Sequence, residues 1–444
     1  MRVVGSRAIL AAAALALSFA AACGSDSGSS SGGTGTGGSG SATPLNIATC
    51  GAPSGSGQFT IVSDLPLQGA SKLQTDQMVK AIDYVLKQHD YKAGDYTVQY
   101  QSCDDSTQQA GKWDAATCTS NANEYARNQS VIGVIGTFNS GCAELEVPVL
   151  NRVSTAMISP ANTWPGLTIK SGLPGEPDKY YPTGTRNYAR VVAVDNSQGA
   201  VDATFAKSIG VKKVYVLNDK EAYGLGVANY FKKAAEKLGL DVVGFDAWDG
   251  KQPNYQSLMQ KIKATNPDAI FLGGLICENG GQLIKDKVDV MGPNDGAVKL
   301  IAPDGFTTDA TLTGEGSAGA AGEGMYSSVA GVPADQLKGA GKEFVDAFQS
   351  ENGLSSLEPY TAYAAQAAEV LLAAIEKSDG TRASVAKNMF GMQVTDGILG
   401  TFTIDDNGDI SGANQFTIDI GKSGHFTTDS VVNPDTQLVQ EITG

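Results

Sequence analysis

The sequence is constrained most by a repeated alternation of strand-like and helix-like segments from residue 57 onward. The apolar runs Phe59–Val62 and Val131–Gly136 predict strands, and a continuous apolar run is typical of a parallel strand covered on both faces. Apolar residues at helical spacing predict an amphipathic helix over 73–88. The alternation restarts at Val211. Two such series predict an α/β fold with two doubly wound parallel sheets.

The remaining elements follow from the same periodicities. Further strands are predicted over 96–101, 155–159, 211–218, 241–245, 269–273 and 299–302, and a hairpin region over 400–426. Further helices are predicted over 115–128, 143–153, 223–238, 255–264, 282–290 and 361–377.

Composition excludes several classes of function. The chain has 444 residues, which corresponds to about two to three domains. Its 47 acidic residues against 32 basic ones argue against a nucleic-acid partner, because nucleic-acid binding needs a basic surface. Only two histidines are present, which argues against a multi-histidine metal site and against a histidine base. The scarcity of histidine also argues against an exported enzyme, and we expect no metal, no cofactor and no enzymatic activity.

The first 23 residues read as an export signal. Arg2 and Arg7 precede an almost uninterrupted apolar run, Ala8–Ala22, which ends at Cys23. This ending resembles a bacterial lipobox, in which the cysteine is lipidated and becomes the mature N-terminus; the alternative is ordinary cleavage that leaves Cys23 unmodified. Residues 24–56 begin with a stretch of Gly, Ser and Thr that predicts a flexible tether. Together they predict an extracytoplasmic protein anchored to the outer face of the cell membrane.

The loops after the predicted strands are where a ligand is expected. In an open α/β sheet, ligands bind beyond the carboxyl ends of the strands. These loops supply hydroxyl groups, helix-start N–H groups, aromatic rings and a few carboxylates, and they cover residues 137–142, 160–164, 219–224, 274–278 and 303–305.

Five motifs carry a resemblance to a known family. They are Ile135–Ser140, Met157–Thr163, Asn218–Gly224, Ala302–Gly305 and Gly397–Asp409. In this order and spacing, the region 57–432 resembles the type I solute-binding proteins of ABC importers, in the leucine/isoleucine/valine-binding branch. The resemblance implies a monomer that captures a small ligand, such as an amino acid, by hinge closure and delivers it to a membrane permease.

The resemblance also implies a division of the chain into two lobes joined by three hinge crossings. The crossings are expected near 190–195, 327–332 and 395–401. Lobe 1 then comprises 57–191 plus 331–397, and lobe 2 comprises 192–330 plus 398–444.

The family's ligand-holding positions fall on specific residues here. Ser140, Ala161 and Thr163 match positions that hold the α-carboxylate, and helix-start N–H groups and hydroxyls favour such an anion. Asp304 matches the acidic residue that holds the α-ammonium, and Tyr223 matches a tyrosine on the opposite lobe. Residues alone leave other roles open, because Ser140 could serve only as a helix cap and Asp304 only as a turn residue.

Side-chain preference is less constrained by the resemblance. A second family tyrosine is replaced by Leu275, while Asn139 and Trp164 are expected near the ligand side chain. Two alternatives stay open: a receptor of the same fold for an amide, an aromatic acid or a peptide-like molecule, used for uptake or sensing, or an exported enzyme with a cleft serine.

The disulfide pairing is predicted from the same resemblance. Cys103 matches a family disulfide cysteine, but the position of its family partner falls near Asn139. Cys118 is the preferred partner and Cys142 the second choice. Cys50 and Cys277 are left unassigned.

Overall fold

The computed structural model describes residues 41–314, 316–412 and 415–443. The predicted export signal 1–23, the lipidation of Cys23 and the first part of the predicted tether lie outside the described residues. Among the helices of these ranges, none has both the length and the apolar character needed to cross a bilayer.

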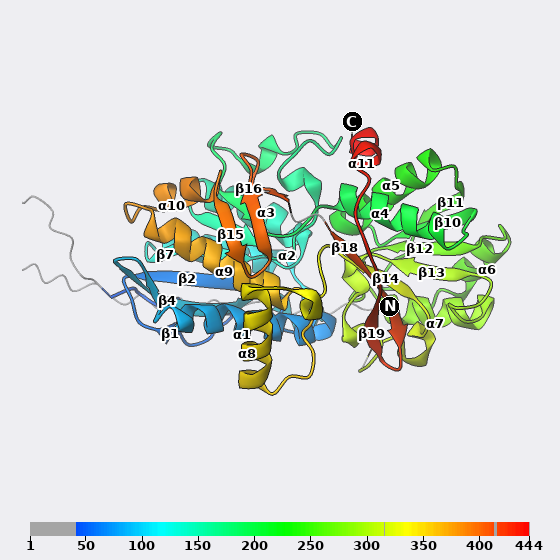
Figure 1. Ribbon diagram of the computed structural model, residues 1–444, viewed down its shortest axis with the longest axis horizontal. Coiled ribbons are helices and arrows are strands. Elements are labelled where there is room, and N and C mark those ends of the chain that lie inside the picture. Colours follow the sequence, from blue (N-terminus) through cyan, green and yellow to red (C-terminus); the bar gives the residue numbers. More distant parts are fainter. Residues whose placement is uncertain (1–40, 315, 413–414, 444) are drawn as a thin grey trace, which may run out of the picture. The chain divides into compact units, whose positions relative to one another are not determined.

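The first series of strand-helix units forms a mainly parallel sheet, with the strand order β1-β4-β2-β7-β8-β9 and β3 paired to β4 (Figure 1). We call it sheet 1. Its strands are β1 (Ser54–Gly55), β2 (Phe59–Leu65), β3 (Lys92–Ala93), β4 (Tyr96–Asp104), β7 (Val131–Gly136), β8 (Ala156–Ser159) and β9 (Tyr188–Arg190). All six residues of β7 are buried, which confirms the strand covered on both faces. Helices α1 (Lys72–Gln88), α2 (Ala115–Arg127) and α3 (Ser140–Asn151) complete these units.

The second series forms sheet 2, whose order is β11-β10-β12-β13-β14-β18-β19. Its strands are β10 (Lys213–Asn218), β11 (Asp241–Ala247), β12 (Ala269–Gly273), β13 (Lys299–Ala302), β14 (Tyr326–Val329), β18 (Phe416–Lys422) and β19 (His425–Val432). The pairs from β11 to β14 are parallel, whereas β18 joins β14 and β19 antiparallel. The associated helices are α4 (Asp195–Ser208), α5 (Ala222–Lys237), α6 (Gln256–Lys263) and α7 (Gly280–Met291). Two doubly wound sheets confirm the predicted fold class.

Two smaller sheets, four further α-helices and several short 3-10 helices complete the described chain. The strands are β5 (Ser106–Thr107) paired with β6 (Lys112–Trp113), and β15 (Gln393–Gly397), β16 (Gly400–Ile404) and β17 (Ile410–Ser411) in one three-stranded sheet. The helices are α8 (Ala340–Asn352), α9 (Thr361–Glu376), α10 (Arg382–Met389) and α11 (Thr436–Thr443).

The third passage between the sheets lies later in the chain than predicted. The boundary at residue 398 falls inside the β15–β16 hairpin, where the N–H of Leu399 donates to Oε1 of Gln366 on α9, the helix that packs on α1 and β7. Asp409 pairs with the fully buried Arg190 at the end of β9, with 2.8 Å between Oδ1 and Nε. Gly408 also packs so closely on β9 that an added Cβ would lie 2.4 Å from the carbonyl oxygen of Tyr188. The chain enters sheet 2 only at β18.

The end of the predicted tether is also wrong. The segment from residue 42 to β1 packs on sheet 1, where Leu45 is buried and its N–H donates to Oε1 of Gln101 at 2.7 Å. Ser54 pairs with Tyr100 in β4. In the sequence, the apolar residues after Pro44 and the cysteine at position 50 indicate where the Gly/Ser/Thr-rich tether ends and the packed segment begins.

Candidate functional site

A cavity lies among loops from both sheets. Loops after β7, β8, β12 and β13 contribute to its wall, as the rule for open α/β sheets predicts. The lining residues are Trp113, Phe138, Asn139, Ser140, Gly141, Ala161, Thr163, Glu221, Tyr223, Leu275, Asp304, Gly305 and Tyr360.

The start of α3 forms one wall of the cavity. Asn139 occupies the N-cap with extended backbone angles but makes no side-chain cap hydrogen bond. The N–H of Cys142 donates to the carbonyl oxygen of Asn139 at 3.1 Å, whereas the N–H groups of Ser140 and Gly141 receive no side-chain cap and lie at the positive end of the helix dipole. The hydroxyl of Ser140 accepts a hydrogen bond from the N–H of Trp164 at 3.3 Å, so its own hydrogen stays available. This wall can bind an anionic group.

The loop after β8 lies beside α3. Thr163 lines the cavity and is almost fully buried. Ala161 also lines it, but its N–H donates to Oγ of Ser159 at 3.1 Å. The buried Arg190 fixes the backbone of this loop, because its Nη1 donates to the carbonyl oxygens of Asn162 at 2.7 Å and Trp164 at 3.0 Å.

Asp304 forms the acidic part of the wall. It begins the turn that follows β13, and its carboxylate accepts two tyrosine hydroxyls. Tyr223 donates to Oδ1 at 2.6 Å, and Tyr360 donates to Oδ2 at 2.8 Å. Burial raises the pKa of Asp304 above the usual carboxyl value, although the hydrogen bonds from the tyrosines oppose this shift. A cationic ligand group beside the carboxylate would compensate the cost of burying its charge.

The cavity brings together seven of the eight residues predicted at the ligand. These seven are Asn139, Ser140, Ala161, Thr163, Tyr223, Leu275 and Asp304. Trp164 is the exception, because it packs into the core: its Nε1 donates to Glu176 at 3.3 Å, and its ring lies against Gly226 of α5. A Cβ on that glycine would meet the ring at 2.1 Å.

Four side chains of the wall were missed from the sequence: Trp113, Phe138, Glu221 and Tyr360. Trp113 lies in the β5–β6 hairpin, which follows β4. Ligands bind beyond the carboxyl ends of the strands in such sheets, so inspecting the segment after β4 as well would have indicated Trp113. Phe138 and Glu221 lie inside loops that were considered, but nothing in their type singled them out. Tyr360 directly precedes α9 and has no comparable signal.

An ion-pair cluster joins the two sides of the cavity mouth. Nζ of Lys112, on β6, contacts the carboxylates of Glu221 at 3.1 Å and Glu278, which belong to loops of sheet 2. Burial alone would lower the pKa of Lys112, but the two carboxylates raise it above the usual lysine value. Lys112 therefore stays charged at neutral pH.

The disulfides differ from the predicted pairing. Cys103 bonds Cys50, and Cys118 bonds Cys142; Cys277 is unpaired among the described residues. The predicted Cys103–Cys118 bridge and the second choice, Cys103–Cys142, are both wrong because the segment after residue 42 packs beside β4 and brings Cys50 to Cys103.

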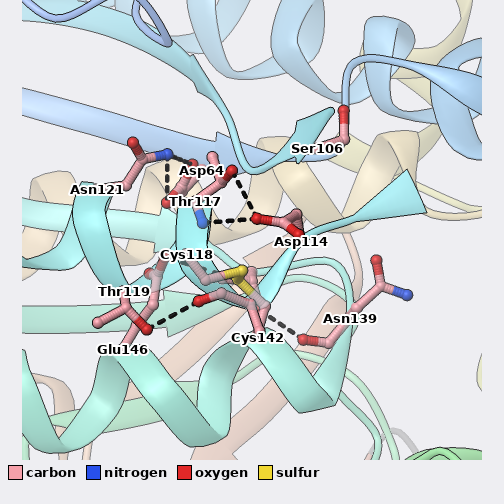
Figure 2. Close-up of a disulfide and its surroundings, with 12 residues drawn as sticks. Asp64, Ser106, Asp114, Thr117, Cys118, Thr119, Asn121, Asn139, Cys142 and Glu146 are labelled. Carbon is pink, nitrogen blue, oxygen red and sulfur yellow. Dashed lines mark hydrogen bonds between the residues drawn. A yellow bond between two sulfur atoms is a disulfide. The ribbon is translucent and has the colours of Figure 1, made fainter. Parts of the chain in front are cut away.

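The second bridge bears directly on the site (Figure 2). Cys118 lies on α2 and Cys142 lies in the first turn of α3, two residues after Ser140. The disulfide thus fixes the helix start that forms the cavity wall. Asp105 lies beside the two sulfur atoms, but sulfurs joined in a disulfide are not thiolates and do not suit a metal.

The chain resembles known proteins over most of its length. A family model described as "Periplasmic binding protein" matches residues 60–418. A Leu/Ile/Val-binding protein homolog of Brucella melitensis is 28% identical over 291 residues, which cover 63% of this chain and 70% of the relative. A Leu/Ile/Val/Thr-binding protein of Salmonella typhimurium is 26% identical over 287 residues, which cover 64% and 71%.

Solved structures share the fold. A leucine binding protein of Thermotoga maritima superposes with a TM-score of 0.72 at 22% identity, covering 85% of this chain and 99% of that one. A solute binding protein of Rhodopseudomonas palustris in complex with 3,4-dihydroxybenzoic acid has a TM-score of 0.68 at 20% identity, covering 85% and 97%.

Proposed function

The chain belongs to the periplasmic binding protein family, with the type I fold, and we propose that it captures an amino acid for an ABC importer. The proposed lobes are sheet 1 with α8–α10 and β15–β17, and sheet 2 with its helices. The ligand binds in the cavity between them and undergoes no chemical change. Lipidated Cys23 anchors the protein to the outer face of the membrane.

One observation supports an amino acid as the ligand: one wall of the cavity can bind an anion, and another wall is acidic. The start of α3, with Ser140, can receive a carboxylate, and Thr163 adds a buried hydroxyl. Asp304 can receive an ammonium group. A zwitterion satisfies both walls at once, whereas a simple acid leaves the buried aspartate without a cation.

Hinge closure follows from contacts that cross between the proposed lobes. Tyr360 precedes α9, which packs on α1 and β7 of sheet 1, yet it bonds Asp304 after β13. Lys112 likewise reaches from β6 to Glu221 and Glu278. A ligand that touches both lobes adds to these contacts and shifts the population toward the closed state, which a permease can recognise.

An aromatic acid is the second candidate ligand. The rings of Trp113, Phe138 and Tyr360 line the cavity, and a similarly folded protein was solved with 3,4-dihydroxybenzoic acid. A benzoate would place a carboxylate and no cation beside Asp304, so this candidate requires that Asp304 be protonated. The two candidates therefore differ in their dependence on Asp304.

Isothermal titration calorimetry on the full chain tests the proposal, with the twenty amino acids and hydroxybenzoates as ligands. We expect an amino acid to bind, and Asp304→Asn to weaken it by about 2–5 kcal/mol because the ammonium loses its charged partner. Asp246→Asn, on β11 and outside the cavity lining, is the matched control. Binding of benzoates alone, undiminished in the Asp304 variant, contradicts the amino-acid assignment.

A further inference from the structure

Two polar atoms in the cavity wall are buried without a hydrogen-bond partner. They are Nε1 of the Trp113 indole and Oδ1 of the Asn139 amide, and neither is bonded within the described parts of the chain. Asn139 is 95% buried, since its exposed fraction is only 5%. Buried polar groups in folded proteins are nearly always bonded, so two unbonded ones in one binding cavity call for an explanation.

The two groups belong to the same side of the cavity. Trp113 is the last residue of β6, and Asn139 occupies the N-cap position of α3. A Cβ added to Gly141, in the first turn of α3, would lie 2.7 Å from the Trp113 ring, so the ring packs directly on this turn. The side chain of Asn139 points away from the Cys118–Cys142 disulfide (Figure 2). Both groups therefore adjoin the helix start proposed to hold the ligand's carboxylate.

The chemistry of the two atoms is complementary to one kind of group. An indole N–H can only donate a hydrogen bond, so it needs an acceptor, and the Asn139 oxygen needs a donor. We propose that the ligand is an amino acid whose side chain ends in a carboxamide, as in asparagine or glutamine, with C=O toward Trp113 and NH₂ toward Asn139. This inference rests on the proposed function.

Other side chains fit less well. An aliphatic side chain supplies neither an acceptor nor a donor, so both buried polar atoms would stay unbonded. A carboxylate side chain supplies acceptors only and would lie in the same cavity as Glu221 and Asp304. Leu275 on the opposite wall suits the methylene stem of the ligand. A site built to bond a polar group rejects an analogue that lacks it, because its own polar atoms are left unpaired.

Calorimetry on the full chain with asparagine, glutamine and leucine tests the inference, since asparagine and leucine have nearly the same shape. We expect at least one carboxamide to bind ten-fold or more tightly than leucine. Trp113→Phe removes the donor and keeps an aromatic ring, and it should weaken the carboxamide at least five-fold while changing leucine less than two-fold. Trp248→Phe, whose indole bonds the carbonyl oxygen of Glu278 outside the cavity lining, is the matched control.

The comparison of ligands in the unaltered protein keeps the test decisive even if a variant fails to fold. Leucine binding as tightly as both carboxamides overturns the inference and leaves the proposed function standing. Equal weakening of leucine and the carboxamide by Trp113→Phe also overturns it. Absence of binding by every amino acid overturns the proposed function, and the inference with it.

Discussion

Tyr360 donates its hydroxyl to Oδ2 of Asp304 at 2.8 Å, which joins the start of α9 to the turn after β13. Because α9 packs on sheet 1 and β13 belongs to sheet 2, this hydrogen bond crosses the ligand cavity. Tyr223 occupies the other carboxylate oxygen from the sheet 2 side. Asp304 therefore accepts hydrogen bonds from residues on the sides of both sheets, and we expect the proposed closure to depend on its charge.

Tyr360→Phe should weaken ligand binding by about 1–2 kcal/mol, because it removes a hydrogen bond to a charged acceptor that forms on closure. Calorimetry on the full chain measures this. Tyr96→Phe is the control, since Tyr96 lies on β4 of sheet 1 and its hydroxyl bonds the carbonyl oxygen of Ser378 just after α9. Unchanged affinity in the Tyr360 variant would mean that the crossing bond does not contribute to the liganded state.

Lys112→Met should weaken ligand binding by about 0.5–1 kcal/mol, because it removes the ion pairs with Glu221 and Glu278 across the cavity mouth. Salt screens such partly exposed pairs, so the affinity of the unaltered protein should fall between 50 and 500 mM NaCl more than that of the variant. Lys72→Met is the control, since its partner Asp76 lies on the same helix. Identical salt dependence in all three proteins would contradict the role of Lys112.

The sequence was a good guide where the periodicity was strong. The strand at 131–136 and the helix at 361–377 are confirmed as β7 and α9, because apolar residues dominate both. Helix α4 was missed because polar residues, including Asp195, Gln198 and Asp202, lie on its buried face. An amphipathic pattern cannot reveal a helix whose buried side is itself polar.

Site residues could be predicted only in loops that directly follow a strand whose carboxyl end was inspected in the sequence. Ser140 and Asp304 were placed on those grounds and by resemblance, and both line the cavity. Tyr360 could not be found, because its approach to Asp304 depends on how α9 and the turn after β13 meet in the folded chain. The Cys118–Cys142 bridge depends on the packing of α2 against α3, which sequence spacing does not encode.

Replacing Cys118 and Cys142 by serine should lower the free energy of unfolding by about 3 kcal/mol, given the loop that the bridge closes. It should also weaken ligand binding, because the bridge holds the first turn of α3. Replacing Cys50 and Cys103 should cost about 4 kcal/mol of stability but leave affinity unchanged. Denaturant unfolding and calorimetry measure the two effects. Equal losses of affinity in both variants would contradict the positioning role of the second bridge.

Three fully buried carboxyl groups predict an unusual pH dependence of stability: Asp64 on β2, Asp105 after β4 and Glu146 on α3. Burial raises the pKa of Asp64 to about 6, and burial together with the neighbouring carboxyl groups raises the pKa of Asp105 and Glu146 well above the usual range. The folded state therefore binds more protons than the unfolded state above about pH 4, so this cluster costs increasing stability as the pH rises through the raised values.

Glu146→Gln should consequently stabilise the protein, and the gain should grow from pH 4 to pH 8. Each unit by which the folded pKa exceeds the unfolded one corresponds to about 1.4 kcal/mol once the pH exceeds both values. Denaturant unfolding at pH 4, 5, 6, 7 and 8 measures the difference from the unaltered protein. Glu124→Gln on α2, where the carboxylate pairs with Arg127 near the surface, should show no such growing gain. The opposite trend would contradict this prediction. If the stability of the variant minus that of the unaltered protein falls from pH 4 to pH 8, Glu146 is ionised and bonded in the folded state.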